Sequence, residues 1–229
     1  MDQLFPQVAI SAVQVLERLG HRVEFPAAQT CCGQPAFNSG YWNDARDVAS
    51  RFLDVFADAE AIVCPSGSCS TMVRQFYTEI FHDTADAKAA AKTAAKTFEF
   101  AEFLVRKLGV TDVGASFPGK VTWHDACHGL RELHLKDEPR QLLRAVRGLD
   151  LVEMKECETC CGFGGTFSIK FPNISVAMDE VKAASIDACG ADYVVSGDSS
   201  CLMQINGLLE KRQSKVKVMH IAEVLASRA

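Results

Sequence analysis

Apolar residues recur along the chain in two alternating patterns, one typical of helices and the other of short buried strands. Segment 43–59 carries Val48, Phe52 and Phe56 at helical spacing, and the apolar run 61–63 that follows it predicts a buried strand. The same reasoning predicts further helices over 6–19, 87–108, 139–147 and 173–188, and further strands over 21–25, 121–127, 151–154 and 192–195. This alternation predicts an α/β fold with mostly parallel sheets.

An internal repeat organises these elements. The Cys-Cys-Gly of 31–33 recurs at 160–162, a displacement of 129 residues. Two further matches follow in the same order, 62–69 with 194–201 and 98–104 with 219–225. The period is that of a domain-sized half, so we expect two duplicated α/β halves, 1–112 and 113–229. The long intervals between cysteines place each thiol on a different loop, and we expect these loops to converge near the interface of the halves.

The repeat also predicts something missing from the first half. The strand predicted over 121–127 ends with Cys127, and subtracting the repeat offset places the counterpart of this cysteine before Met1. We therefore expect the first half to lack its opening strand and its first cysteine, and the numbered start not to be the natural beginning of the fold.

Composition narrows the class of protein. Hydrophobic residues make up 48% of the chain, enough for a sizeable core, and this excludes a disordered chain. A net charge of −5 argues against nucleic-acid binding. No apolar run approaches the roughly 18 residues of a membrane span, and no secretory signal precedes Ile10, so we expect a cytoplasmic protein. In that reducing compartment, 10 cysteines favour a metal or redox site over a disulfide framework.

The two adjacent cysteine pairs point to a particular kind of chemistry. A trans peptide separates their Cα atoms by about 3.8 Å, so a disulfide within a pair would be strained. Two adjacent thiolates can instead reach different irons of one cluster. The glycines beside the pairs allow tight turns whose N–H groups can hydrogen-bond cluster sulfur: Gly33, Gly162, Gly164 and Gly165. Zinc stays open, because four thiolates also satisfy a tetrahedral site.

Most of the other residues of interest near these cysteines have two possible roles. Cys157 is either an extra ligand or a chance thiol, and Cys64 is expected to be a small core residue. His124 and His128 flank Cys127, where each is either a hydrogen-bond donor or ligand at the site, or an ordinary loop histidine.

The residues that carry this pattern also resemble a known family. Five stretches, together covering much of the chain, show the likeness: 13–20, 29–41, 65–69, 160–168 and 217–225. They resemble the cysteine-rich CCG domain found in heterodisulfide reductase and in glycolate oxidase iron–sulfur proteins, and more closely the lactate utilization protein A family. The resemblance implies an iron–sulfur protein, with one or two [4Fe–4S] clusters per chain. It further implies that the chain relays electrons, without binding lactate itself, within a complex of partner subunits that oxidises L-lactate to pyruvate.

The resemblance also implies ligands. The complete set is Cys127, Cys160, Cys161 and Cys201, and the incomplete counterpart is Cys31, Cys32 and Cys69. The CCG protein of heterodisulfide reductase ends each motif with Cys-x-x-Cys, and here Ser66 or Asp198 replaces the first cysteine. This departure favours a four-cysteine cluster over a five-cysteine one, and leaves Asp198 as a conceivable ligand. A thiol/disulfide reductase subunit and a structural zinc-binding module are the alternatives.

Overall fold

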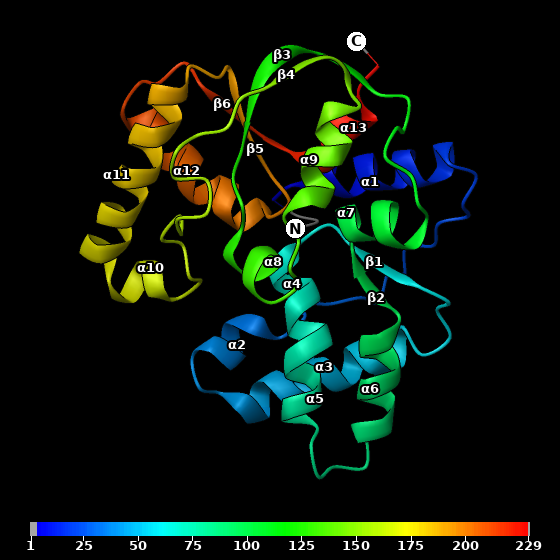
Figure 1. Ribbon diagram of the computed structural model, residues 1–229. Helices are drawn as coiled ribbons and strands as arrows, with labels where there is room; N and C mark the ends of the chain where they lie inside the picture. Colours follow the sequence, from blue (N-terminus) through cyan, green and yellow to red (C-terminus); the bar gives the residue numbers. More distant parts are fainter. Residues whose placement is uncertain (1–3, 229) are drawn as a thin grey trace.

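Two parallel sheets form the framework of the protein, whose residues 4–228 are described by a computed structural model (Figure 1). The smaller sheet pairs β1 (Ile62–Cys64) with β2 (Thr97–Glu99). The larger sheet has the order β4-β3-β5-β6, with β3 (Ser116–Trp123), β4 (Arg147–Leu151), β5 (Tyr193–Ser196) and β6 (Lys217–His220). Every strand pairing between these elements of residues 4–228 is parallel. The predicted α/β class with parallel sheets is confirmed.

Helices cover both faces of the larger sheet. Its helices are α8 (Cys127–Arg131), α9 (Asp137–Arg144), α10 (Phe167–Lys170), α11 (Pro172–Cys189), α12 (Ser199–Lys211) and α13 (Ile221–Ala226). In Figure 1, α11 and α12 lie on one side of the sheet, and α9 and α13 lie on the other. Apolar side chains of α11 and α12, among them Ile186 and Ile205, pack with Val194 of β5 into one buried cluster.

Most helices of the first half gather below the larger sheet in Figure 1, and the first of them lies beside α13. The helices of this half are α1 (Pro6–Arg18), α2 (Gln34–Asn38), α3 (Trp42–Val55), α4 (Gly67–Thr71), α5 (Tyr77–Ile80), α6 (Ala87–Ala95) and α7 (Phe100–Glu102), with π-helical turns η1 (Met72–Phe76) and η2 (Phe103–Lys107). Phe52, Tyr77 and Phe81 stack edge to face at the centre of their core.

The first helix leaves the other first-half helices and packs against the last one. Helix α1 lies along α13 (Figure 1), and Val15 and Leu16 share a buried cluster with Leu225. Arg18 fastens the pair, since its guanidinium donates to the carbonyls of Leu225 and Ala226 at 3.0 and 2.7 Å. The main core therefore contains residues from both sides of position 112, and the division into 1–112 and 113–229 stays a prediction.

The repeat is visible in the helix starts that follow the last strand of each sheet. Strand β2 leads into α7 through Glu99, and β6 leads into α13 through His220. Each of these residues forms a capping box with a glutamate three residues later, Glu102 or Glu223. Equivalent positions in the two halves thus cap the N-termini of equivalent helices, with a glutamate in one half and a histidine in the other.

Three predicted elements are wrong. The strand predicted over 151–154 shares only Leu151 with β4, because the chain enters the sheet four residues earlier, at Arg147. The segment 21–25 is not a strand, because none of the strands within residues 4–228 lies beside it to form a ladder. The predicted helix over 87–108 is broken at 97–99, where β2 pairs with β1. The alanine- and lysine-rich sequence favoured one continuous helix, but residues 97–99 form a strand because they pair with β1. Among residues 4–228, no helix is long and apolar enough to cross a membrane.

Candidate metal centre

The cysteines of the second half meet at one edge of the larger sheet. Cys127 begins α8 after β3, the pair Cys160 and Cys161 lies in the loop after β4, and Cys201 lies in the first turn of α12 after β5. Because these strands are parallel, their carboxyl ends lie at the same edge. Cys160 is within hydrogen-bond contact of Cys127 and Cys161, and Cys161 is within contact of Cys201. The four thiols thus form one continuous group.

The cysteines of the first half form the first group, and the four thiols of the second half form the second group. Cys32 is within hydrogen-bond contact of Cys31 and Cys69, the latter from α4. Cys64, the last residue of β1, is within contact of Cys69. Sequence reasoning assigned Cys64 to the core and missed this contact. The available signal was its position at the carboxyl end of a strand, close to Cys69.

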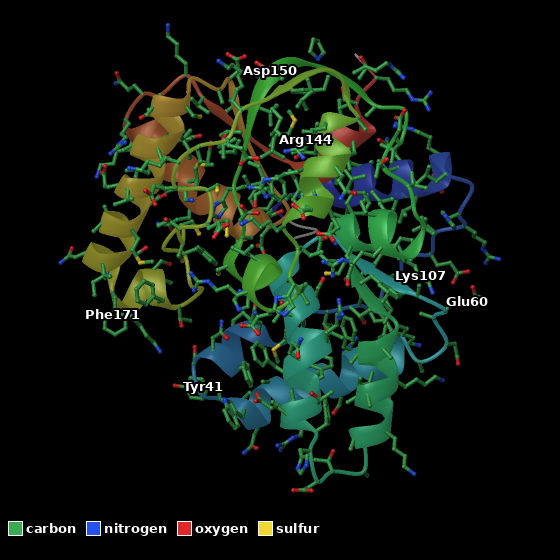
Figure 2. All side chains as sticks on the ribbon, in the orientation of Figure 1. Tyr41, Glu60, Lys107, Arg144, Asp150 and Phe171 are labelled. Atoms are coloured by element: carbon green, nitrogen blue, oxygen red, sulfur yellow. The ribbon has the colours of Figure 1, made fainter. Side chains whose placement is uncertain are left out.

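The two groups of cysteines lie near each other. Helix α4, which carries Cys69, packs against α8, which begins with Cys127. The loops after the two cysteine pairs also touch, since Ser39 Oγ lies 3.1 Å from Thr166 Oγ1. The exposed rings of Tyr41 and Phe171 lie on the same side of the molecule in Figure 2.

The two Cys-Cys-Gly turns have the same geometry. Gly33 and Gly162 have φ values of 86° and 87°. Each glycine donates its N–H to the sulfur of the first cysteine of its pair, Gly33 to Cys31 at 3.5 Å and Gly162 to Cys160 at 3.4 Å. A Cβ at Gly162 would lie 2.5 Å from the carbonyl oxygen of Ser175, so only glycine fits.

The other two predicted glycines shape the loop that follows the second pair. Gly164 and Gly165 have φ values of 52° and 62°. These consecutive left-handed residues turn the chain toward α10, and a Cβ at Gly164 would lie 2.8 Å from Phe167 Cβ.

Contacts between neighbouring thiols lower the pKa of some cysteines of each group: Cys160 in the second group, and Cys31 and Cys69 in the first. The contacts from Cys127 and Cys161 lower the pKa of Cys160 to about 2. The contact from Cys32 lowers the pKa of Cys31 to about 6. The donors respond in the opposite direction, since the contact with Cys160 raises the pKa of Cys127 and of Cys161. Metal binding would displace the protons that remain on these thiols.

A buried cation faces the second group. Lys182 of α11 is 0% exposed, and its ammonium donates to the carbonyls of Glu156 and Cys157, the latter at 3.2 Å. Its charge acts on the thiols of Cys161 and Cys201. Nothing in the sequence distinguishes this lysine from those on solvated helix faces, because its burial depends on how α11 packs. A fixed positive charge suits a site that gathers several thiolates.

Two histidines accompany Cys127. His124 is 0% exposed, and a ring nitrogen lies within 4.8 Å of the sulfurs of both Cys161 and Cys201. Burial lowers the pKa of His124 to about 3, so the ring is neutral at pH 7. His128 lies with Nδ1 3.7 Å from Cys127 Sγ and Nε2 3.4 Å from Gln34 Nε2.

Both carboxylate oxygens of Asp198 accept hydrogen bonds from other residues of the protein. Its Oδ1 accepts hydrogen bonds from the Ser200 backbone and hydroxyl, at 3.2 and 2.6 Å. Its Oδ2 accepts from the Ser68 N–H at 2.9 Å and from the Ser66 hydroxyl at 3.4 Å. Asp198 therefore caps α12 and links it to the start of α4.

Two remaining cysteines stand apart from the four-thiol group of the second half. Cys157 gathers with Asp125 and Glu158, whose ligand atoms all lie within 4.8 Å of one another. Cys189 ends α11 and donates to the carbonyl of Ile186 at 3.1 Å, as a thiol at a helix end commonly does.

The donor set fits a thiolate-bound metal centre. Four thiols converge, a glycine N–H already contacts one sulfur, and a buried lysine supplies opposite charge. Duplicated Cys-Cys-Gly turns beside parallel sheets define the chain as a cysteine-rich protein of the CCG class, and a model of that cysteine-rich domain matches residues 1–74 and 121–206.

Full-length relatives identify the family within that class. The chain is 47% identical over 229 residues to "Lactate utilization protein A" of Geobacillus kaustophilus, covering 100% of this chain and 95% of the relative. It is 49% identical over 230 residues to "Lactate utilization protein A 2" of Bacillus mycoides, covering 100% and 96%. A third relative, "Lactate utilization protein A" of an Exiguobacterium species, is 49% identical over 227 residues, covering 98% and 92%. The chain belongs to the lactate utilization protein A family.

Proposed function

We propose that this chain is a cytoplasmic iron–sulfur electron-transfer subunit that works with partner subunits in oxidising L-lactate to pyruvate. The names of its full-length relatives support the lactate pathway. The observation that carries the iron–sulfur part is the convergence of four thiols from three separate loops beside a buried lysine. The relatives do not favour the thiol/disulfide reductase alternative.

The residues of the second group are proposed as the ligands of one [4Fe–4S] cluster: Cys127, Cys160, Cys161 and Cys201. Such a cluster supplies one-electron transfer when it is bound. The chain holds the sulfurs in place through α8, α12 and the Cys-Cys-Gly turn, and the Gly162 N–H donates to the Cys160 sulfur. Asp198 is left out of the ligand set, because both of its oxygens already accept hydrogen bonds from protein groups.

Three residues of the first group, Cys31, Cys32 and Cys69, are proposed as ligands of a second centre, and Cys64 is not included among them. Its turn repeats the Gly33-to-Cys31 hydrogen bond of the other site. We expect this centre to bind metal more weakly, because it draws on fewer of the expected cysteines.

Anaerobic purification followed by iron and sulfide counting and electron paramagnetic resonance tests the metal assignment. We expect about four irons per chain for one occupied site and about eight for two. Cys161→Ser should lose the iron and sulfide of one site. Cys189→Ser is the matched control, because Cys189 donates within α11 away from both groups, and it should keep them. Zinc without labile sulfide would reject the iron–sulfur proposal in favour of the zinc alternative.

Growth on L-lactate tests the physiological part. A strain lacking this gene should fail to grow on lactate, and the wild-type chain should restore growth. Cys161→Ser should fail to restore growth, whereas Cys189→Ser should succeed. Normal lactate growth of the deletion strain would refute the assignment to lactate oxidation.

A further inference from the structure

The buried histidine beside the second cysteine group is not accounted for by the fold. His124 follows β3 directly and precedes Cys127 by three residues. Its side chain is 0% exposed, and neither Nδ1 nor Nε2 makes a hydrogen bond of ordinary geometry among the described residues, although the nearby backbone of Cys157 opposes the lowering of the ring's pKa by burial. A buried polar group without a partner is unfavourable, so such a group needs an explanation.

The backbone around His124 fixes where the imidazole lies. The His124 N–H donates to the carbonyl of Val195 at 2.8 Å, and the His124 carbonyl accepts from Ser196 Oγ at 3.0 Å. Both contacts come from β5, so the residue is held at the sheet edge where the cysteine loops meet. A ring nitrogen there lies within 4.8 Å of the sulfurs of Cys161 and Cys201.

A comparison with a second buried histidine shows that burial alone does not produce this arrangement. His220 is also buried, at 1% exposed, and its Nε2 has no partner within residues 4–228. However, its Nδ1 accepts from the Ala222 N–H at 3.1 Å, and this bond caps α13. His220 therefore has a structural role, whereas the His124 ring lies beside cysteine sulfurs.

We propose that His124 donates an imidazole N–H hydrogen bond to the sulfur of Cys161 or Cys201 in the metal-loaded centre, and thereby stabilises the reduced state of that centre. This inference rests on the proposed iron–sulfur function. Four thiols already supply one ligand for each corner of a four-iron cluster, which leaves the imidazole as a donor to sulfur and not as a fifth ligand. Reduction adds negative charge that spreads onto the sulfurs, so a hydrogen bond to sulfur favours the reduced state.

Paired variants of the full-length, anaerobically purified protein test the proposal. His124→Leu removes the donor at similar volume, and His124→Gln keeps an N–H donor. We expect His124→Leu to retain wild-type iron and sulfide but to reduce less favourably by about tenfold, a downward shift of about 59 mV in midpoint potential. His124→Gln should retain most of the wild-type potential. His220→Gln is the matched control and should leave the potential unchanged.

A spectroscopic measurement separates a donor from a ligand. In the reduced wild-type protein, pulsed electron paramagnetic resonance should detect a weak nitrogen coupling that disappears in His124→Leu. A coupling as strong as that of a directly bound nitrogen would overturn the proposal. Equal potentials in wild type and His124→Leu, or equal shifts in the Leu and Gln variants, would also overturn it. A wild-type chain without iron and sulfide would instead refute the proposed function itself.

Discussion

At the residue scale, the two glycines after the cysteine pairs are tightly constrained. Both have positive φ, and both lie against the backbone of a helix further along the chain, α3 for Gly33 and α11 for Gly162. A Cβ would lie 3.0 Å from the Ala45 carbonyl at Gly33 and 2.5 Å from the Ser175 carbonyl at Gly162. The turn at Gly33 therefore packs directly on α3, and the turn at Gly162 packs directly on α11. This packing positions the cysteines of each turn relative to its helix.

Replacing Gly162 by alanine should destabilise the protein more than replacing Gly165. Both residues have positive φ, but a Cβ at Gly165 meets nothing within 4 Å. We expect Gly165→Ala to lower the free energy of unfolding by about 1–3 kcal/mol through backbone strain alone. Gly162→Ala should lose more, because the Ser175 carbonyl must also move. Urea unfolding of the two variants measures the difference, and equal losses would contradict the seating of the turn on α11.

Glu99 should make stability depend on pH. Its side chain is 3% exposed, and burial raises its pKa to about 8 from the ordinary 4.5. The folded protein therefore holds a proton that the unfolded chain releases, and this stabilisation is complete below pH 4.5 and is lost as pH rises through about 8. Glu99→Gln keeps an acceptor for the α7 cap but cannot ionise. Its melting temperature should fall less than that of the wild type between pH 5 and about 8, and parallel profiles would refute this.

At the scale of elements, one ion-pair network holds the segment that carries Cys127. Asp125 accepts from Trp123 Nε1 at 2.7 Å and from both terminal nitrogens of Arg140 at 2.9 and 2.7 Å. Arg140 of α9 also bonds Glu153, beyond the end of β4, at 2.7 Å. Helix α9 thus ties together the loops that carry Cys127 and the pair Cys160 and Cys161.

Arg140→Met should be strongly destabilising. It would leave Asp125, 3% exposed, without its cation, and removing one partner of a buried ion pair costs about 3–5 kcal/mol. Lys136→Met is the matched control, because it breaks the exposed ion pair with Glu158 one turn earlier on the chain. The control should unfold close to the wild type in urea. Similar losses in the two variants would show that the buried network does not hold the loop.

At the scale of the whole molecule, the main core joins the two ends of the chain. Helix α1 packs along α13, and Arg18 donates to carbonyls at 113, 225 and 226. The duplicated halves are therefore not two independent packing units, and they should unfold together.

Coincident unfolding curves would test this joint core. In Trp42→Phe, the remaining Trp123 reports on the larger sheet, while far-ultraviolet circular dichroism reports on all helices. We expect both signals to give one urea midpoint. Arg18→Met should shift both midpoints down together, because it frees the end of α13 from α1. Two separate midpoints would show that the halves unfold independently.

Much of the site was open to prediction because it is repeated in the chain. The Cys-Cys-Gly matches at 31–33 and 160–162 are local features, and the glycines fit turns that only glycine can adopt. The strand–helix alternation predicted parallel sheets, and parallel sheets bring their loops to one edge. The convergence of Cys127 with Cys160, Cys161 and Cys201 follows from that geometry.

Tertiary structure alone decided which residues surround the cysteines. In the sequence, Lys182 resembles any lysine on a solvated helix face, and only the packing of α11 buries it. His124 resembles a loop residue, and only its contacts with β5 show that it is buried at the sheet edge. Strand pairing also decided two local structures. Pairing with β1 turned 97–99 into the strand β2 inside an expected helix, and 21–25 has no partner strand among residues 4–228. Sequence periodicity determines which face of an element is apolar, whereas burial and pairing depend on residues far away in the chain.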